Sequence, residues 1–188
     1  MEIYLIRHTT PDIEKGVCYG QSDLDLVSTY NDEFNAVKSK LQNFKNYQVF
    51  SSPLKRCALL AKAFSKTVVF DNRLKELDFG DWELRAWHDI SEDEINPWME
   101  DFVNVVVPNG ESYMQLASRV TSYLEEIIHS TNNQNLIIVS HAGPIRVILA
   151  SIMNIHLKDS FKIKVNYGDA FHLKKTNGKL KLITEINL

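Results

Sequence analysis

The sequence predicts an α/β protein, a three-layer α/β/α sandwich with a mostly parallel sheet and a C-terminal antiparallel hairpin. Two patterns predict this fold. Short apolar runs alternate with helical patterns along most of the chain, as in sheets covered by helices on both faces. The last two strand candidates flank Thr176-Asn177-Gly178, a turn sequence typical of a hairpin. The length of 188 residues suits one domain, 1–188.

Each strand candidate is a short run of apolar, β-branched or aromatic residues. The run Leu136–Val139 is almost entirely aliphatic, which is typical of a strand buried on both faces. The other candidates are Ile3–Ile6, Gln48–Ser51, Thr67–Phe70, Ala170–Lys174 and Leu180–Ile186.

The helical signals are capping residues and apolar stripes at three- and four-residue steps. Ser52 is expected to cap a helix that has Pro53 at its first position and runs from Leu54 to Phe64. Asn109 is expected to cap another helix. The stripe of the first helix consists of Phe34, Val37, Leu41 and Phe44, the stripe after Asn109 extends from Tyr113 to Ile128, and a last helix follows Ser140–Pro144 and ends near Met153.

The segment 71–108 fits neither pattern. It holds Trp82, Trp87 and Trp98, many acids and little periodicity. We interpret it as a partly helical, lid-like insertion within the single domain, because long insertions in compact domains tend to be functional. The tryptophans could provide a stacking surface for a ring, or could be ordinary core and lid packing.

Composition excludes several classes of function. The formal net charge of −3 shows no basic excess of the kind that nucleic-acid binding requires. No run approaches the ~20 apolar residues of a membrane helix, and the N-terminal run is too short and too acidic for a signal peptide. Cys18 and Cys57 match no zinc or redox spacing. We therefore expect a cytoplasmic protein with reduced thiols, no nucleic-acid or membrane partner, and an oligomeric state that the sequence leaves open.

Basic residues and histidines gather where three predicted strands end. Arg7 and His8 follow the first strand, Arg56 lies just inside the helix after the second, and His141 follows the fourth. Ligands of such sheets bind beyond the carboxyl ends of the strands. Arg56 could simply reach a surface carboxylate, yet it lies in a first helical turn that favours acids over bases. Together with Arg7, it indicates a site for an anion.

Two guanidinium groups and two imidazoles suit a tetrahedral dianion such as phosphate. An imidazole can attack phosphorus directly, and the leaving oxygen then needs a proton from a nearby acid. Four carboxylates follow the third strand and could reach the same edge of the sheet. These are Glu76, Asp78, Asp81 and Glu83, and the chemistry alone does not choose among them.

Four motifs in this order resemble the histidine phosphatase superfamily, also called the phosphoglycerate mutase-like family, from residue 3 to about residue 150. Leu5-Ile6-Arg7-His8 resembles its strand ending in Arg-His, and Ser140-His141-Ala142-Gly143 its second histidine motif. Between them, Ser51–Ala58 is similar to Ser-Ser-Pro-x-x-Arg-x-x, and Leu74–Glu83 to Glu-x-x-Phe-Gly-x-Trp-Glu.

The resemblance implies a phosphatase that needs no metal and no cofactor. His8 would be the phosphorylated nucleophile, and Glu76 would donate and then accept a proton. Arg7, Arg56 and His141 would bind the phosphoryl group and stabilise its transition state. Further substrate contacts would come from Thr9, Tyr19, Gln21 and Ala142.

The chain departs from the family pattern after His8. It has Thr9-Thr10 where the family usually has Gly-Glu, and Glu14 where an Asn often stands. Because Thr9 adopts a positive φ only at a cost, the turn after His8 must avoid one. Whether Thr9 and Glu14 contribute to phosphate binding is open at this stage.

Within the family, several segments resemble α-ribazole phosphatases of cobalamin biosynthesis, which act on α-ribazole 5′-phosphate. They are Gly16–Asp23, Phe79–Glu83, Pro97-Trp98 and Asn109–Ser112. The alternatives are a broad-specificity histidine phosphatase, a phosphoglycerate mutase and a non-catalytic binder of phosphate ligands. A metal-dependent hydrolase with His8 and His141 as ligands lacks the usual ligand spacing, and a dinucleotide-binding domain lacks GxGxxG.

Overall fold

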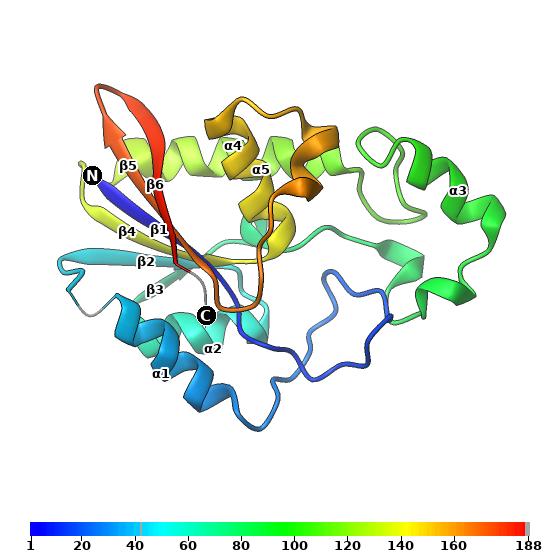
Figure 1. Cartoon of the computed structure of the whole chain (residues 1–188), viewed down its shortest axis with the longest axis horizontal. Coiled ribbons are helices and arrows are strands. Elements are labelled where there is room, and N and C mark those ends of the chain that lie inside the picture. The colour runs from blue at the N-terminus through cyan, green and yellow to red at the C-terminus, as the bar shows by residue number, and fades with distance from the viewer. Residues whose placement is uncertain (42, 187–188) are drawn as a thin grey trace.

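A six-stranded mixed sheet, in the order β3-β2-β4-β1-β5-β6, forms the centre of the computed structural model, which describes residues 1–41 and 43–186 (Figure 1). Strands β1 to β4 run parallel to one another. Strand β5 pairs antiparallel with β1, and β6 pairs antiparallel with β5. This confirms the predicted fold class. Residues 42, 187 and 188, which the predicted domain includes, lie outside the described part. The strands are β1 (Glu2–Arg7), β2 (Tyr47–Ser51), β3 (Val68–Phe70), β4 (Asn135–Ser140), β5 (Ala170–Thr176) and β6 (Lys179–Ile186).

Helices cover both faces of the sheet (Figure 1). Helices α1 (Tyr30–Lys40) and α2 (Lys55–Phe64) pack on one face, and α4 (Tyr113–Ser130) and α5 (Ala142–Met153) on the other. Strand β4 is buried on both sides: Leu136 and Ile138 join the core beneath α4 and α5, while Ile137 and Val139 join the core beneath α1 and α2. The aliphatic run that predicted this strand therefore serves two cores.

The predicted start of α2 was wrong. Its N-cap is Leu54 and its first residue is Lys55, so Ser52 does not cap it and Pro53 is not its first residue. The reason is that the backbone of Ser52 continues the sheet, with its N–H donating to Val139 O at 3.0 Å. The turn that leads into the helix is therefore two residues longer than the capping pattern indicates.

Two other helix boundaries also differ. Helix α4 is capped by Ser112, whose side chain and that of Gln115 form a reciprocal capping box. Asn109 instead adopts φ 55° and its side chain donates to Asp81 Oδ2 at 2.8 Å. Helix α1 ends at Lys40, so Phe44 lies outside the helix, where it stacks on Tyr47.

The segment 71–108 is partly helical, as predicted. It contains α3 (Glu92–Glu100), which stands off the sheet beyond the ends of β1, β2 and β4 (Figure 1). It also contains three 3₁₀ helices, Asn72–Leu74, Gly80–Trp82 and Trp87–Asp89, and a fourth follows α5 at Leu157–Lys162. Several apolar side chains of this segment belong to the core beneath α4 and α5, so the segment packs as part of the main fold. They include Leu74, Leu77, Trp82, Ile90, Trp98 and Val107.

Among the described residues, no helix combines the length and the apolar character that crossing a bilayer requires.

Candidate active site

His8 lies directly after β1, held by its backbone. Its N–H donates to Ser140 O at 3.0 Å, and its carbonyl accepts from Gly168 N at 3.1 Å. The ring is 1% exposed, and its Nδ1 lies 2.7 Å from Thr9 O. A carbonyl oxygen only accepts, so Nδ1 carries the hydrogen and Nε2 keeps its lone pair. Burial, and then the charges of Arg56 and Arg7, hold the pKa of His8 well below 6.5, which keeps the ring neutral.

His141 lies directly after β4, as the N-cap of α5. The two histidine rings are 5.1 Å apart between centroids and meet edge to face. His141 Nε2 is 2.8 Å from Ser52 Oγ and 3.4 Å from Cys57 Sγ. Burial and the charge of Arg56 lower the pKa of His141 well below 6.5 as well. The predicted convergence of the two histidines is therefore present in the structure.

Arg56 is fully buried in the first turn of α2. Its Nη1 donates to Ser22 O at 2.7 Å and its Nη2 donates to Gly20 O. These two carbonyls accept from the terminal nitrogens, whereas Nε has no hydrogen-bond partner among the described residues.

Arg7 is held in a similar way on the other side of the site. Its Nη1 donates to Val165 O at 2.7 Å, and its guanidinium group lies 4.0 Å from the ring centroid of Tyr167. Within the described residues, Arg7 Nε and Thr9 Oγ1 are also buried without a hydrogen-bond partner. Since buried donors are rarely left unpaired, three such donors beside or near His8 fit a site that an anion completes.

Glu76 faces the start of α5. Its Oε1 accepts from Leu77 N at 3.0 Å and from Gly143 N at 3.1 Å, and its Oε2 lies 3.2 Å from Gly143 N. A Cβ at position 143 would lie 2.2 Å from Oε1, so the carboxylate approaches this closely only because residue 143 is glycine.

The other three carboxylates of this segment have other partners. Asp78 accepts from Gly80 N at 2.9 Å, and Asp81 accepts from the side chain of Asn109. Glu83 accepts from the N–H groups of residues 20, 21 and 22 and from Ser22 Oγ. Of the four, Glu76 alone borders the cavity described next.

A cavity of about 210 Å³ adjoins Arg7 and Glu76. Its wall is largely aromatic and apolar, and Arg146 adds a second guanidinium group. Within the described residues, Arg146 Nε donates to Ile163 O at 3.1 Å, its terminal nitrogens have no hydrogen-bond partner, and its guanidinium group lies 5.1 Å from the ring centroid of Phe161. A larger groove of about 620 Å³ between α4, α5 and the β5–β6 turn contains none of the predicted site residues. The cavity beside Arg7 is lined further by Val17, Tyr19, Leu77, Phe79, Trp87, Tyr113, Ala142, Gly143 and Phe161.

The predicted substrate-contact residues are only partly brought together. Tyr19 and Ala142 line the cavity, and Thr9 is buried beside His8 with a backbone that avoids positive φ, as predicted. Gln21 is not in the lining; its Nε2 donates to Glu76 O at 3.2 Å. Glu14 is exposed and also outside the lining.

The three tryptophans divide between the two possibilities that the sequence left open. Trp82 and Trp98 are buried in ring contacts with each other, 5.7 Å between centroids, and are core packing. Only Trp87 borders the cavity.

Sequence reasoning missed Arg146, Tyr167, Tyr113 and Phe161. Arg146 had a usable signal, since it lies near the start of α5 as Arg56 does in α2. Tyr167 had none: it approaches His8 from the far end of the chain, 5.6 Å between ring centroids, and its hydroxyl is 2.6 Å from that of Tyr19.

Comparison with known proteins agrees with the fold and the motifs. The sequence profile of the Histidine phosphatase superfamily (branch 1) matches residues 3–187, so the chain belongs to this superfamily. Its members include phosphatases and mutases that act on small phosphate esters.

Individual relatives are distant. Phosphoserine phosphatase 1 of Hydrogenobacter thermophilus is 27% identical over 165 residues, 84% of this chain and 78% of that protein. The probable phosphoglycerate mutase GpmB of Escherichia coli is 28% identical over 165 residues, 82% and 76% of the two chains. The crystal structure of the α-ribazole phosphatase from Shigella flexneri superposes with a TM-score of 0.89 over 97% of this chain and 95% of that chain, at 22% identity. That similarity establishes the fold.

Proposed function

We propose that this protein hydrolyses phosphomonoesters through a phosphohistidine formed on His8. One observation carries the proposal: the hydrogen bond from Nδ1 to Thr9 O leaves Nε2 of a buried ring unprotonated, within the influence of the charges of Arg56 and Arg7. A neutral imidazole with a fixed tautomer is a ready nucleophile, and fixed cations stabilise the equatorial oxygens of the transferring phosphoryl group.

The reaction proceeds in two steps. His8 Nε2 attacks phosphorus and forms an N–P bond as the ester P–O bond breaks, and Glu76 donates a proton to the leaving oxygen. Water then attacks the phosphohistidine and gives its proton to Glu76. Phosphate leaves and His8 is restored. Arg7, Arg56 and His141 hold the phosphoryl oxygens in both steps, and this chemistry requires no metal.

For the substrate we propose α-ribazole 5′-phosphate, which would place the protein in cobalamin biosynthesis. The cavity beside Arg7 supports this, since Trp87, Phe79 and Phe161 give it the aromatic wall that a flat, uncharged ring would stack on. The proposal includes a cytoplasmic location, as the sequence predicts, in which the free thiols Cys18 and Cys57 stay reduced.

One observation favours a second candidate, an acid-bearing ester such as phosphoserine. Arg146 lines the cavity, its terminal nitrogens have no hydrogen-bond partner among the described residues, and a guanidinium group matches a carboxylate on the leaving group. The relative in Hydrogenobacter thermophilus is named for that substrate.

The experiment that tests the proposal measures hydrolysis of α-ribazole 5′-phosphate, phosphoserine, 3-phosphoglycerate, sugar phosphates and 4-nitrophenyl phosphate, all in EDTA. We expect activity, highest on α-ribazole 5′-phosphate. A preference for phosphoserine would transfer the assignment to the second candidate. Isomerisation of 3-phosphoglycerate with a bisphosphate primer would identify a mutase, and loss of all activity in EDTA would exclude the metal-free mechanism.

The first prediction concerns the nucleophile. His8→Ala removes the attacking nitrogen and should lower kcat by roughly 10⁴-fold or more. The control is His129→Ala, because His129 is exposed at the end of α4. Labelling with a ³²P ester, quenched in alkaline detergent and analysed as alkali-stable, acid-labile protein phosphate, should be seen in the control and be absent from His8→Ala. Near-normal turnover of His8→Ala would refute the mechanism.

A further inference from the structure

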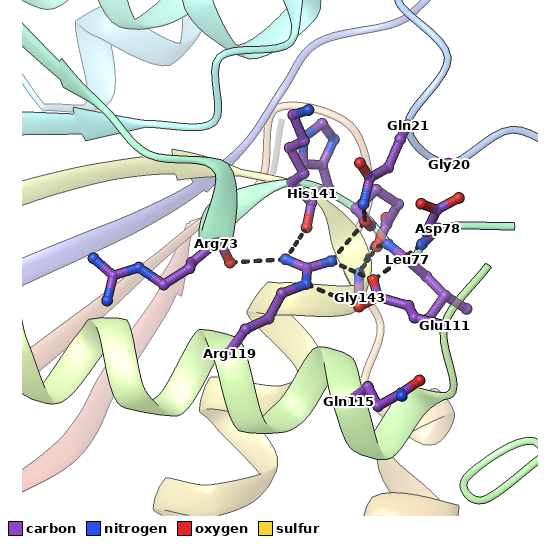
Figure 2. Close-up of polar contacts among 12 residues, drawn as sticks. Gly20, Gln21, Arg73, Leu77, Asp78, Glu111, Gln115, Arg119, His141 and Gly143 are labelled. Carbon is purple, nitrogen blue, oxygen red and sulfur yellow. Dashed lines mark hydrogen bonds and ion pairs between the residues drawn. The ribbon is translucent and has the colours of Figure 1, made fainter. Parts of the chain in front are cut away.

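Arg119 on α4 binds the backbone of the segment that carries Glu76. Its Nη1 donates to Arg73 O and to Lys75 O, each at 2.8 Å, and its Nη2 donates to Glu76 O at 2.8 Å. Figure 2 shows the guanidinium group of Arg119, which extends from α4, joined by dashed lines to its partners, among them the carbonyl group of Arg73. One side chain therefore fixes three carbonyl groups of a four-residue stretch.

Glu111 binds both Arg119 and the backbone that follows Glu76 in the chain. It accepts from Arg119 Nε at 3.0 Å and forms a charge-assisted second bond with Nη2. The same carboxylate accepts from Asp78 N at 3.0 Å, and Glu111 N donates to Asp78 O at 3.0 Å. Both residues of the pair are less than one-fifth exposed. The backbone is thus held at residues 73, 75 and 76 by Arg119 and at residue 78 by Glu111.

The direction of the Glu76 carboxylate depends on this backbone. Within the described residues, its hydrogen-bond partners are the N–H groups of Leu77 and Gly143. In the part of the chain that the structure describes, no side chain forms a hydrogen bond with this carboxylate, and Arg146 interacts with it only through its charge. A shift of the backbone at residue 76 would therefore move the carboxylate relative to α5 and to the cavity.

We propose that Arg119, with Glu111, is the positioning residue for the proton donor of this enzyme. Arg119 does not line the cavity, so it acts through Glu76 and not on the substrate. The inference rests on the proposed function in one respect, the role of Glu76 as the acid. It goes beyond that function in assigning to α4 a part in setting which esters are cleaved efficiently.

The kinetic test compares Arg119→Met with Glu76→Gln on two esters. An alkyl phosphate needs its leaving oxygen protonated, whereas 4-nitrophenyl phosphate does not. A general acid contributes about 10²–10⁴-fold, so we expect Arg119→Met to lower kcat/KM for the alkyl ester by at least about 10-fold and for 4-nitrophenyl phosphate by less than threefold. In a Glu76→Gln background, Arg119→Met should cause no further loss on the alkyl ester.

The matched control is Arg73→Met. Arg73 is also a paired guanidinium group at this contact, bound to Asp71 and Glu126, but its side chain does not touch the backbone of Glu76. It should reproduce any general loss of stability without the dependence on the leaving group. Equal losses of Arg119→Met on both esters, or additive losses in the Glu76→Gln background, would overturn the inference.

A second measurement does not depend on turnover. The amide proton of Gly143, followed by ¹⁵N-resolved NMR against pH, should respond to ionisation of Glu76 because the two groups are hydrogen-bonded. In Arg119→Met this response should shrink or disappear, and in Arg73→Met it should persist. An unchanged NMR response in Arg119→Met would overturn the inference, even if no ester is cleaved. If instead the NMR response changes as expected but none of the esters is hydrolysed, only the proposed function is refuted.

Discussion

At the scale of single residues, Gly143 shows how closely the site is packed. It is the second residue of α5, and its N–H donates to the carboxylate of Glu76. Nothing in its helical backbone requires glycine. The requirement comes from the approach of Glu76 Oε1, which would lie 2.2 Å from an added Cβ.

The prediction for this residue is that Gly143→Ala displaces the carboxylate and leaves the helix in place. Alanine favours helix by about 1 kcal/mol over glycine, so the fold should persist. We expect kcat/KM on an alkyl phosphate to fall about 10-fold or more and on 4-nitrophenyl phosphate to change little. Ser151→Ala, on the exposed side of the same helix, is the control. Unchanged cleavage of the alkyl ester would show that the close contact has no role in proton donation.

At the scale of elements, the loop at residues 20–22 links Glu83 to Arg56. Glu83 accepts from three consecutive N–H groups of this loop, and the carbonyls of Gly20 and Ser22 accept from Arg56. Burial raises the pKa of Glu83, but the hydrogen bonds from Ser22, Gly20 and Gln21 outweigh this effect, so the pKa is lowered overall. The carboxylate thus stays ionised and orients the loop that orients Arg56.

The prediction for this element is that Glu83→Gln weakens phosphate binding without contacting phosphate. A glutamine has one acceptor oxygen, and its amide group would face N–H donors. We expect the inhibition constant of inorganic phosphate to rise about 10-fold, together with a lower Tm. The control is Glu125→Gln on the exposed side of α4. If phosphate inhibition is unchanged in Glu83→Gln, Arg56 does not depend on this loop for its position.

Elements were predicted best where burial repeats along the chain. The strands, the helices α2 and α5, and the apolar stripe of α4 were predicted because apolar residues mark buried positions along the chain. Helix starts were predicted less well at Ser52 and Asn109, since both residues can cap a helix but are used elsewhere. Ser52 continues the pairing of β2 with β4, and Asn109 binds Asp81. Contacts with residues distant in the chain decide which role such a residue takes, and these contacts cannot be read from the local sequence.

At the scale of the whole molecule, the buried neutral histidines link stability to pH. His8 and His141 have pKa values held well below 6.5 in the folded protein, whereas in the unfolded chain they titrate near 6.5. Below pH 6.5 the unfolded chain therefore binds more protons, so acidification favours unfolding.

The prediction is a free energy of unfolding that is level above pH 6.5 and falls as pH decreases below it, by up to about 1.4 kcal/mol per pH unit for each histidine. Urea titrations between pH 5 and 7.5 measure it. The double variant His8→Asn, His141→Asn should flatten the profile over this window. An equally steep profile in that variant would assign the loss of stability to other groups.

The part of the candidate site that could be predicted is the part that follows directly from strands ending at one edge of the sheet. Arg7, His8, Arg56 and His141 meet because neighbouring parallel strands end at one edge. The position of Glu76 against the start of α5 and beside the cavity was not decidable from the residues, because it depends on where the N-terminus of α5 lies. The contact of Tyr167 with His8 could not be predicted from the sequence either, because Tyr167 lies in the stretch before β5, more than 150 positions after His8 in the chain.

The clustering of aromatic rings in the segment 71–108 has a spectroscopic consequence. All three tryptophans of the chain lie within one contact group, with centroid separations of 5.7 to 6.4 Å, and one of them borders the cavity. Intrinsic emission excited at 295 nm therefore comes from this part of the molecule alone. Fluorescence followed during ligand titration or denaturation reports the environment of that segment, while the sheet and the helices α1 and α2 are silent in it.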